Sequence, residues 1–382
     1  MSLLRGLLGR STPRRLKTSS LLSPSEGYAP PSQDTLAAIA ELSQMVKNNP
    51  DAIEIYLALG NLYRSRGEIE RAVQIRNNLI VRPGLDKTFK ARALFELGLD
   101  YKRGGFYDRA QAAFEDARGL IGDDPAILGE LARLAAEGKD YDRAAQIYAL
   151  LGKPIPQAHY LVRCAHQKAQ DDPRSSRKWL DKALQVYPGS VEAHLELLTR
   201  AYAKHDWDRM GRIFSKALES VPEELRFLLL EGLMQHVVCQ NNGNGDTEGV
   251  SIPPTSPVLP PECCEALLPV IEAQQNDLLL YFYGAWLLIQ AGDYDKAKTD
   301  LEKTLLLNPD FWPARLELLS LTLDEQTLTP VFKGQLEFFL KHARRVKRFV
   351  CTKCGLKRER IFFVCPRCQS WHSISFRRAL ND

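Results

Sequence analysis

The chain has 382 residues, of which 45% are hydrophobic and 26% charged, and its formal net charge at pH 7 is +4. A chain of this length can hold two or three domains, or one long repeat array, around a large core. No stretch approaches the roughly 18 uninterrupted apolar residues of a membrane-spanning helix, and the N-terminal sequence does not read as a secretory signal. We therefore expect a cytoplasmic protein.

The charge is unevenly distributed along the chain. Residues 1–25 carry a formal charge of +5, residues 26–340 carry −11 and residues 341–382 carry +10. The first 33 residues are rich in serine, proline and basic side chains, so we predict a disordered basic segment over 1–33. Two other interpretations stay open: an organelle transit peptide, or weak contact with an anionic membrane surface through Leu3, Leu4, Leu7 and Leu8.

From about Asp34 the sequence repeats itself at close to 34 residues, which is the period of the tetratricopeptide repeat. Each such unit is a pair of helices that cannot bury its apolar face alone, so successive units must stack into a superhelix. We predict an all-α solenoid over residues 34–345. Its clearest motifs are Tyr56-x2-Leu59-Gly60-x2-Tyr63, Leu94-x2-Leu97-Gly98-x2-Tyr101 and Tyr281-x2-Gly284-Ala285.

Small residues recur at two positions of this repeat. Gly60 and Gly98 occupy the position where the first helix of a pair touches the second, and there only a small residue allows close approach. A second set falls in the turn between the two helices, where a left-handed backbone favours glycine. We assign Gly67, Gly105, Gly138 and Gly292 to that turn.

The array is interrupted once and then closed by further helices. Residues 241–261 contain an Asn/Gly-rich run followed by several prolines, so we predict a flexible insertion there. Beyond the last repeat motif, residues 311–323 and 329–345 have the pattern of helices that complete the solenoid.

The C-terminal region carries two paired-cysteine motifs separated by ten residues, Cys351-x2-Cys354-Gly355 and Cys365-Pro366-x-Cys368. Two such turns facing each other make a tetrahedral cage of four thiolates, which is typical of a structural zinc site. We predict a small β metal-binding module over residues 346–376, with short strands at 348–350 and 360–364. Phe349, Phe362, Phe363 and Trp371 either cover the cage or pack it against the last helices of the array.

The identity and role of the metal depend on this closed cage. Zinc is favoured because it accepts four thiolates without a redox demand, and iron is the alternative. A cage with no open coordination position does not activate water. The seven histidines are scattered, and no recognised catalytic motif appears. We therefore predict a protein that is not an enzyme and has no catalytic residues.

The combination of repeats and cysteines resembles a known family. A tetratricopeptide array followed by the two cysteine motifs and Trp371 is similar to lipopolysaccharide assembly protein B, over about Leu36 to His372. The resemblance implies a rubredoxin-like metal domain docked on the repeats. It also implies an adaptor that regulates lipopolysaccharide synthesis by linking the committed-step deacetylase to a membrane-bound AAA protease. Family members begin with a transmembrane helix, which this sequence does not show.

The resulting hypothesis is a non-enzymatic adaptor that binds client proteins in the groove of its solenoid. Its expected partners are a lipid A pathway deacetylase and a membrane AAA protease, at the cytoplasmic side of the inner membrane. Two alternatives remain. The basic residues around the cysteines are also typical of a zinc-ribbon nucleic-acid-binding protein, and an iron-filled cage is typical of an electron carrier.

Overall fold

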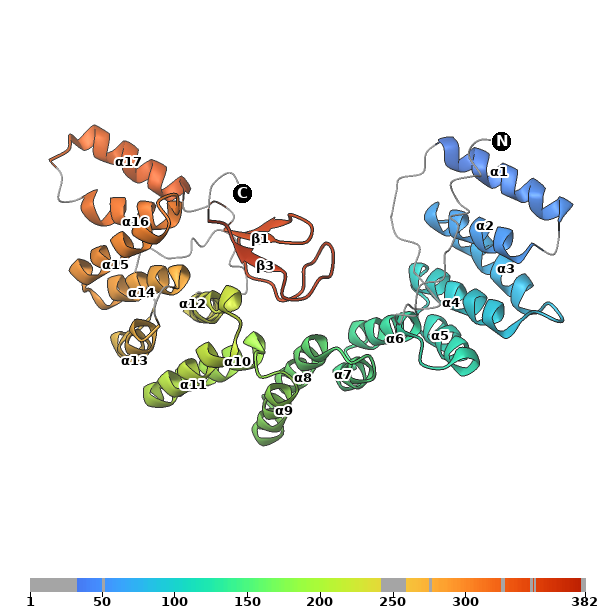
Figure 1. Cartoon of the computed structure of the whole chain (residues 1–382), viewed down its shortest axis with the longest axis horizontal. Helices are drawn as coiled ribbons and strands as arrows, with labels where there is room; N and C mark the ends of the chain where they lie inside the picture. The colour runs from blue at the N-terminus through green and yellow to red at the C-terminus, as the bar shows by residue number, and fades with distance from the viewer. Residues whose placement is uncertain are drawn as a thin grey trace. The chain divides into compact units, whose positions relative to one another are not determined.

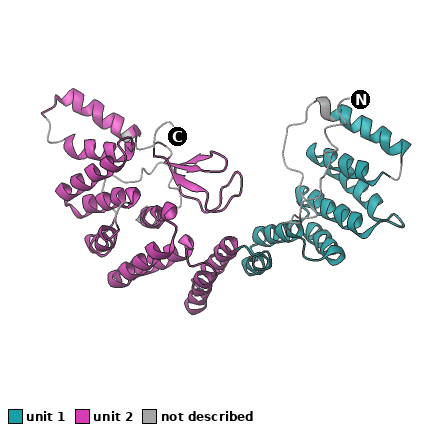
Figure 2. Ribbon diagram, viewed as in Figure 1, with its two compact units in different colours: residues 1–153 teal, residues 154–382 magenta. Residues whose placement is uncertain are grey.

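The computed structural model describes residues 33–49, 52–241, 259–274, 277–323, 327–343, 346 and 348–378. The chain divides into two compact units, residues 1–153 and residues 154–382 (Figure 2). The predicted segment 1–33 lies outside the described residues except for Gln33, and the predicted insertion 241–261 lies outside them over 242–258. The predicted domain boundaries therefore stay a prediction.

In unit 1 each helix packs against the next in sequence order, as the repeat pattern requires. Consecutive helices form antiparallel pairs such as α2 with α3 and α4 with α5 (Figure 1). The helices of this unit are α1 (Gln33–Asn48), α2 (Ile53–Ser65), α3 (Ile69–Ile80), α4 (Lys87–Arg103), α5 (Tyr107–Ile121), α6 (Pro125–Glu137) and α7 (Tyr141–Leu150).

The small residues lie where the sequence places them. A Cβ atom added at Gly60 on α2 would come within 2.6 Å of the guanidinium carbon of Arg76 on α3. One added at Gly98 on α4 would come within 2.5 Å of the Phe114 ring on α5. Both distances are too short for a side chain, so the expected close approach of paired helices is confirmed.

The turn between paired helices follows the prediction at three positions out of four. Gly67, Gly105 and Gly292 have φ values of 79°, 80° and 84°. Gly138, in contrast, has φ −75°, and the next residue, Lys139, takes the left-handed conformation with φ 61°. The assignment of Gly138 is therefore wrong by one residue, because a lysine here adopts the backbone that glycine adopts in the other turns.

A cluster of charged side chains is buried between α2, α3 and α4. Arg64 contacts Glu96 and Asp100, each at 2.8 Å, and Arg76 lies 3.4 Å from Asp100. Arg76 is fully buried and also donates to the backbone carbonyl of Leu57 at 2.9 Å. Burial raises the pKa of Asp100 to about 6, even though both arginines act to lower it.

Unit 2 begins with the same pattern of paired helices. The expected closing helices at 311–323 and 329–345 are confirmed, with bounds slightly shorter than predicted. The helices are α8 (Pro154–Lys168), α9 (Pro173–Val186), α10 (Val191–Tyr202), α11 (Trp207–Ser220), the 3-10 helix η1 (Glu223–Leu225), α12 (Phe227–Asn241), α13 (Pro261–Glu272), α14 (Leu278–Ala291), α15 (Tyr294–Leu307), α16 (Trp312–Thr322) and α17 (Pro330–Ala343).

The C-terminal module contains a small antiparallel sheet with the strand order β2-β1-β3. Its strands are β1 (Phe349–Cys351), β2 (Lys357–Arg358) and β3 (Ile374–Phe376). The strand predicted at 348–350 is confirmed. The one predicted at 360–364 is wrong, because only Val364 makes an isolated bridge, to Trp371. The sequence analysis missed β3, which pairs with β1 through Phe349 and Phe376.

The fold class predicted from the sequence is confirmed: an α-helical repeat solenoid with a small β module of zinc-ribbon type. Within the described ranges, every helix falls short of the combination of length and apolar character that a membrane crossing requires.

Candidate metal centre and the docking of its module

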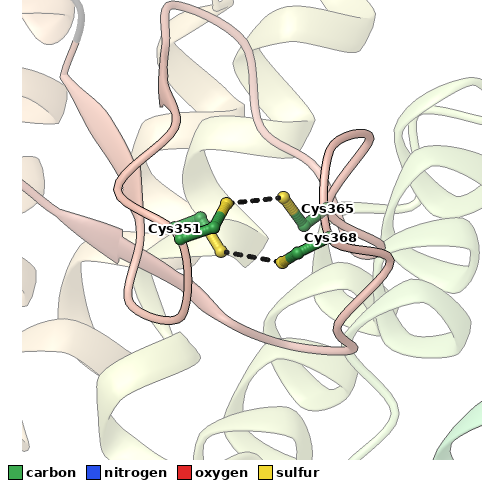
Figure 3. Close-up of side chains that lie close together, drawn as sticks. Cys351, Cys365 and Cys368 are labelled. Carbon is green, nitrogen blue, oxygen red and sulfur yellow. Dashed lines mark hydrogen bonds between the residues drawn. The ribbon is translucent and has the colours of Figure 1, made fainter. Parts of the chain in front are cut away.

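The four predicted cysteines come together at one point of the module (Figure 3). The sulfur atoms of Cys351, Cys354, Cys365 and Cys368 all lie within 4.8 Å of one another. The Cys351–Cys368 pair is separated by 3.7 Å and the Cys354–Cys365 pair by 3.6 Å. A tetrahedron with metal–sulfur bonds of about 2.3 Å has edges of about 3.8 Å. The cage therefore has the size that a single four-coordinate ion requires.

The two cysteine turns have the same backbone geometry. In the first, the N–H of Gly355 donates to the carbonyl of Cys351 at 2.9 Å, and in the second Gln369 donates to Cys365 at 2.8 Å. Gly355 and Gln369 both have positive φ, 70° and 55° respectively. The sequence identified the glycine of the first turn. It gave no signal for Gln369, which performs the same role despite its side chain.

Hydroxyl groups surround the cysteine sulfurs. The oxygen of Ser373 lies 3.2 Å from the sulfur of Cys351, and that of Ser370 lies 3.0 Å from the sulfur of Cys368. Burial raises the pKa of Cys351, but the contact with Ser373 and nearby backbone N–H groups lower it, with a net result of about 5. Groups that donate to a thiolate favour the deprotonated form that binds a metal.

The module is attached to the helices first through an aromatic cluster. Phe349 on β1 stacks on Phe227 at the start of α12, with ring centroids 5.9 Å apart. Phe376 on β3 lies with its edge toward Phe227 at 5.9 Å and contacts Phe282 on α14 at 6.3 Å. Phe311, just before α16, lies 5.7 Å from Phe376. The module thus shares one continuous apolar core with the helices.

A buried ion pair forms the second attachment. Arg348 donates to Glu231 on α12 at 2.8 Å, and both side chains are almost completely buried. The hydroxyl of Tyr283 on α14 donates to the other oxygen of Glu231 at 2.6 Å. Burial and the negative charge of Glu231 raise the pKa of Tyr283 well above its ordinary value, so the phenol remains a donor.

The third attachment joins the module to α8 and α10. Glu192 on α10 lies 3.1 Å from the ring nitrogen of His159 and 3.3 Å from that of His372. Burial raises the pKa of Glu192, but the two histidines lower it more strongly, to about 2. Trp371 packs on the rings of His159 and Tyr160, at centroid distances of 5.0 and 5.9 Å.

These contacts correct the expected position of the module. The sequence left open whether the aromatic residues cover the cage or pack it against the last helices, whereas the module contacts mainly α8, α10, α12 and α14. Of the four aromatic residues, Phe349 is fully buried and Trp371 packs on α8, so neither simply covers the cage. The partners Glu192 and Glu231 carried no signal in the sequence, because a buried carboxylate in a helix is recognisable only once its distant partner is known.

The first helices of three successive pairs surround a cavity beside the module. This cavity, of about 340 Å³, is bounded by α8, α10, α12 and Phe363 of the module. Residues on each helix face it: His159, Val162, Arg163 and His166; Glu192, Leu195, Glu196 and Thr199; and Gly232, Gln235, His236 and Cys239. The inner face of the first helices, where a client was expected, therefore contains a real cavity in unit 2.

The basic residues of the module have different environments. Arg348 is buried in an ion pair with Glu231, whereas Lys353, Lys357, Arg358 and Arg360 are exposed. Arg344, Arg345 and Lys347 lie outside the described residues. One of these basic residues, Arg348, therefore helps to attach the module to the helices. The exposed ones are the residues with which the module could contact a nucleic acid, so that alternative remains to be tested.

The fold and the cysteine cage define the class: this is a tetratricopeptide-repeat protein with a C-terminal four-cysteine module. Two family profiles described as tetratricopeptide repeat match residues 95–158 and 279–311. A solved tetratricopeptide repeat protein from Parabacteroides merdae covers 71% of this chain and 98% of its own, at 18% identity and a TM-score of 0.32. So low a score carries no argument.

The resemblance predicted from the sequence is confirmed by named relatives. Lipopolysaccharide assembly protein B of Haemophilus influenzae is 27% identical over 337 residues, which is 84% of this chain and 78% of that protein. The protein of the same name from Escherichia coli K12 is 23% identical over 362 residues, 88% of this chain and 84% of that protein. The similarity thus spans most of the chain.

Proposed function

We propose that Cys351, Cys354, Cys365 and Cys368 hold one zinc ion in a closed, structural site. The sulfur–sulfur distances of 3.6 and 3.7 Å support a tetrahedral ion. When bound, the metal would join the two cysteine turns and so fix the position of the segment between them, which contains β2. Elemental analysis of purified protein should find one zinc per chain. A red colour with visible absorbance would instead support iron and the electron-carrier alternative.

We propose that the protein is a non-enzymatic adaptor that binds other proteins on the inner face of its repeats. The observation that carries this proposal is the cavity bounded by α8, α10, α12 and Phe363. Stacked helical repeats present extended concave surfaces that bind peptide segments. Here Phe363 of the metal module forms one wall of that surface. A metal that orders the module would therefore also order this part of the binding surface.

We infer the cellular process in which this adaptor works from the names of similar proteins. The names of the similar proteins support a role in lipopolysaccharide assembly. We propose that the protein links the committed-step deacetylase of that pathway to a membrane AAA protease, on the cytoplasmic side of the inner membrane. In this account residues 34–345 form the scaffold and residues 346–376 form the metal module.

Affinity capture from the native cell tests this role. Tagged wild-type protein, a Cys365→Ser variant and a matched Lys353→Ser control are compared by mass spectrometry of the captured proteins. Lys353 is an exposed residue of the first cysteine turn that is not part of the cage and does not line the cavity. Wild type and Lys353→Ser should recover the deacetylase and the protease, and Cys365→Ser should recover much less. Capture of neither protein by the wild type would contradict the proposed link.

A further inference from the structure

The cavity beside the metal module has an apolar interior. Val162 and Leu195 are among its lining residues, and Phe363 closes one side. Gly232 is required for this arrangement, because a Cβ atom there would clash with Leu195 and would lie 3.2 Å from Ile361 of the module. The helix α12 therefore approaches both α10 and the module without a side chain between them.

A second cavity, of about 400 Å³, lies on the other side of Glu196. It is lined by residues of α9 and α10 and by the residues that lead into α11, and Glu196 lines both cavities. Its charged lining is mostly basic: Arg177, Arg200, Lys204 and Arg209, with Glu196 and Asp206. An apolar cavity and a basic one are therefore adjacent on the same pair of repeats.

Two of the three carboxylates that line these cavities are held by neighbours. Glu192 contacts His159 and His372. Glu196 accepts from Arg200 at 2.7 Å and contacts His166 at 2.8 Å. Two of the five lysine and arginine side chains of the lining are themselves paired, Arg200 with Glu196 and Arg177 with Asp181 at 3.0 Å. Lys204 and Arg209 also line the basic cavity, against Asp206, the remaining carboxylate of the lining. The surplus positive charge favours a ligand that carries carboxylates.

We propose that the two cavities together bind an acidic peptide segment of a partner protein. A bulky apolar side chain of the segment enters the cavity beside Phe363, and neighbouring aspartate or glutamate side chains lie over the basic cavity. This inference rests on the proposed adaptor function and adds the chemistry of the client. Since Phe363 belongs to the metal module, the affinity for the client depends on the occupancy of the cysteine cage.

Selection from a phage library of random dodecapeptides tests the proposal without knowledge of the client. Full-length zinc-loaded protein is the target, and a Cys239→Trp variant, which narrows the mouth of the apolar cavity, is used for counter-selection. The peptides that survive should combine leucine or an aromatic residue with several acidic residues. Enrichment of basic peptides, or of no common pattern, would overturn the proposal.

A direct binding measurement separates the two cavities. The best acidic peptide, labelled with fluorescein, is titrated against Lys204→Glu with Arg209→Glu, and against the matched control Arg174→Glu with Lys178→Glu. Both controls are exposed on α9 and line neither cavity. The first double variant should bind about tenfold or more weakly, and the control should bind like the wild type. Equal binding by all three proteins would refute the assignment.

Two further measurements distinguish competing explanations. If oligothymidylate of twelve nucleotides displaces the peptide at equal concentration, the surface recognises polyanions in general and the assignment to an acidic peptide falls. If cellular capture of the deacetylase succeeds while acidic peptides fail to bind, the adaptor function stands and this inference alone is wrong.

Discussion

Both units bury charged side chains, but the partners come from very different distances along the chain. In unit 1, Arg64 pairs with residues 32 and 36 positions away, within neighbouring helical pairs. In unit 2, Arg348 pairs with Glu231 at a separation of 117 residues, and His372 with Glu192 at 180. The repeats thus neutralise their buried charges locally, whereas the module and its helices depend on each other.

This difference explains why we expect mutations to unfold the metal module more readily than the repeats. A segment of about 30 residues cannot bury enough apolar surface to fold alone. It therefore depends on the proposed metal, the shared aromatic cluster and the two long-range charge contacts together. The repeats need only their immediate neighbours.

Loss of the metal should have the largest effect. The Cys365→Ser change removes one of four thiolates, and metal binding contributes on the order of 10 kcal/mol to the folding of small zinc domains. We expect loss of metal by elemental analysis and a changed indole N–H NMR resonance of Trp371, with the far-UV helical signal mostly kept. The control Cys239→Ser should keep the metal. Loss of most helical signal in Cys365→Ser would show that the repeats are not independent of the module.

Removal of one member of the buried ion pair should have the next largest effect. Arg348→Met leaves Glu231 buried without its cation, and this typically destabilises by about 3–5 kcal/mol. The double variant Arg348→Met with Glu231→Leu should recover most of that loss, since no charge is left buried. Unfolding in urea, followed by the indole N–H NMR resonance of Trp371, measures both losses of stability.

The matched control for this pair lies in unit 1. Arg118 and Asp123 are 2.7 Å apart, but their side chains are 33% and 52% exposed. Arg118→Met should therefore cost less than about 1 kcal/mol. A comparable loss in both variants would remove the distinction between the buried and the exposed pair.

Acid should release the module before it unfolds the repeats. The pKa of Glu192 is lowered from 4.5 to about 2. A lowered pKa in the folded state adds stability that is complete above pH 4.5 and is lost as the pH falls from 4.5 to 2. The loss is on the order of 3 kcal/mol. A pH titration of the indole N–H NMR resonance of Trp371 should show this step, and Glu192→Gln should remove it. Superimposable acid curves for the two proteins would exclude Glu192 as its cause.

Glycine substitutions should give the smallest effects and opposite signs. Gly98→Ala places a methyl group against the Phe114 ring and should destabilise unit 1 by about 1–3 kcal/mol. Gly119→Ala, in the exposed face of α5 with no atom near the added Cβ, should stabilise by up to about 1 kcal/mol. Thermal unfolding followed by circular dichroism compares them. Two changes of the same sign would argue against close packing at Gly98.

Sequence analysis predicted the features that depend on local spacing. Gly60 and Gly98 mark close helix approach, and the four cysteines converge as their spacing indicates. The errors concern backbone conformations that side chains do not reveal. Lys139 adopts a conformation expected of glycine, and the apolar run at 360–364 forms a single bridge instead of a strand.

The position of the module could not be predicted for a different reason. Its partners Glu192 and Glu231 lie on helices whose apolar pattern is that of any repeat. A carboxylate on such a helix reads as a solvated residue until Arg348 or His372 is placed beside it. Contacts between residues more than one hundred positions apart produce no periodic pattern that can be recognised in a single sequence.

The late position of β3 in the chain has a consequence for biosynthesis. Domains fold from the N-terminus while the chain is being made, so the repeats leave the ribosome with Glu192 and Glu231 still lacking His372 and Arg348. Cys368 and β3 are synthesised only after all of the helices that their module contacts. A truncated or metal-starved product would therefore lack the wall that Phe363 supplies to the proposed client-binding cavity.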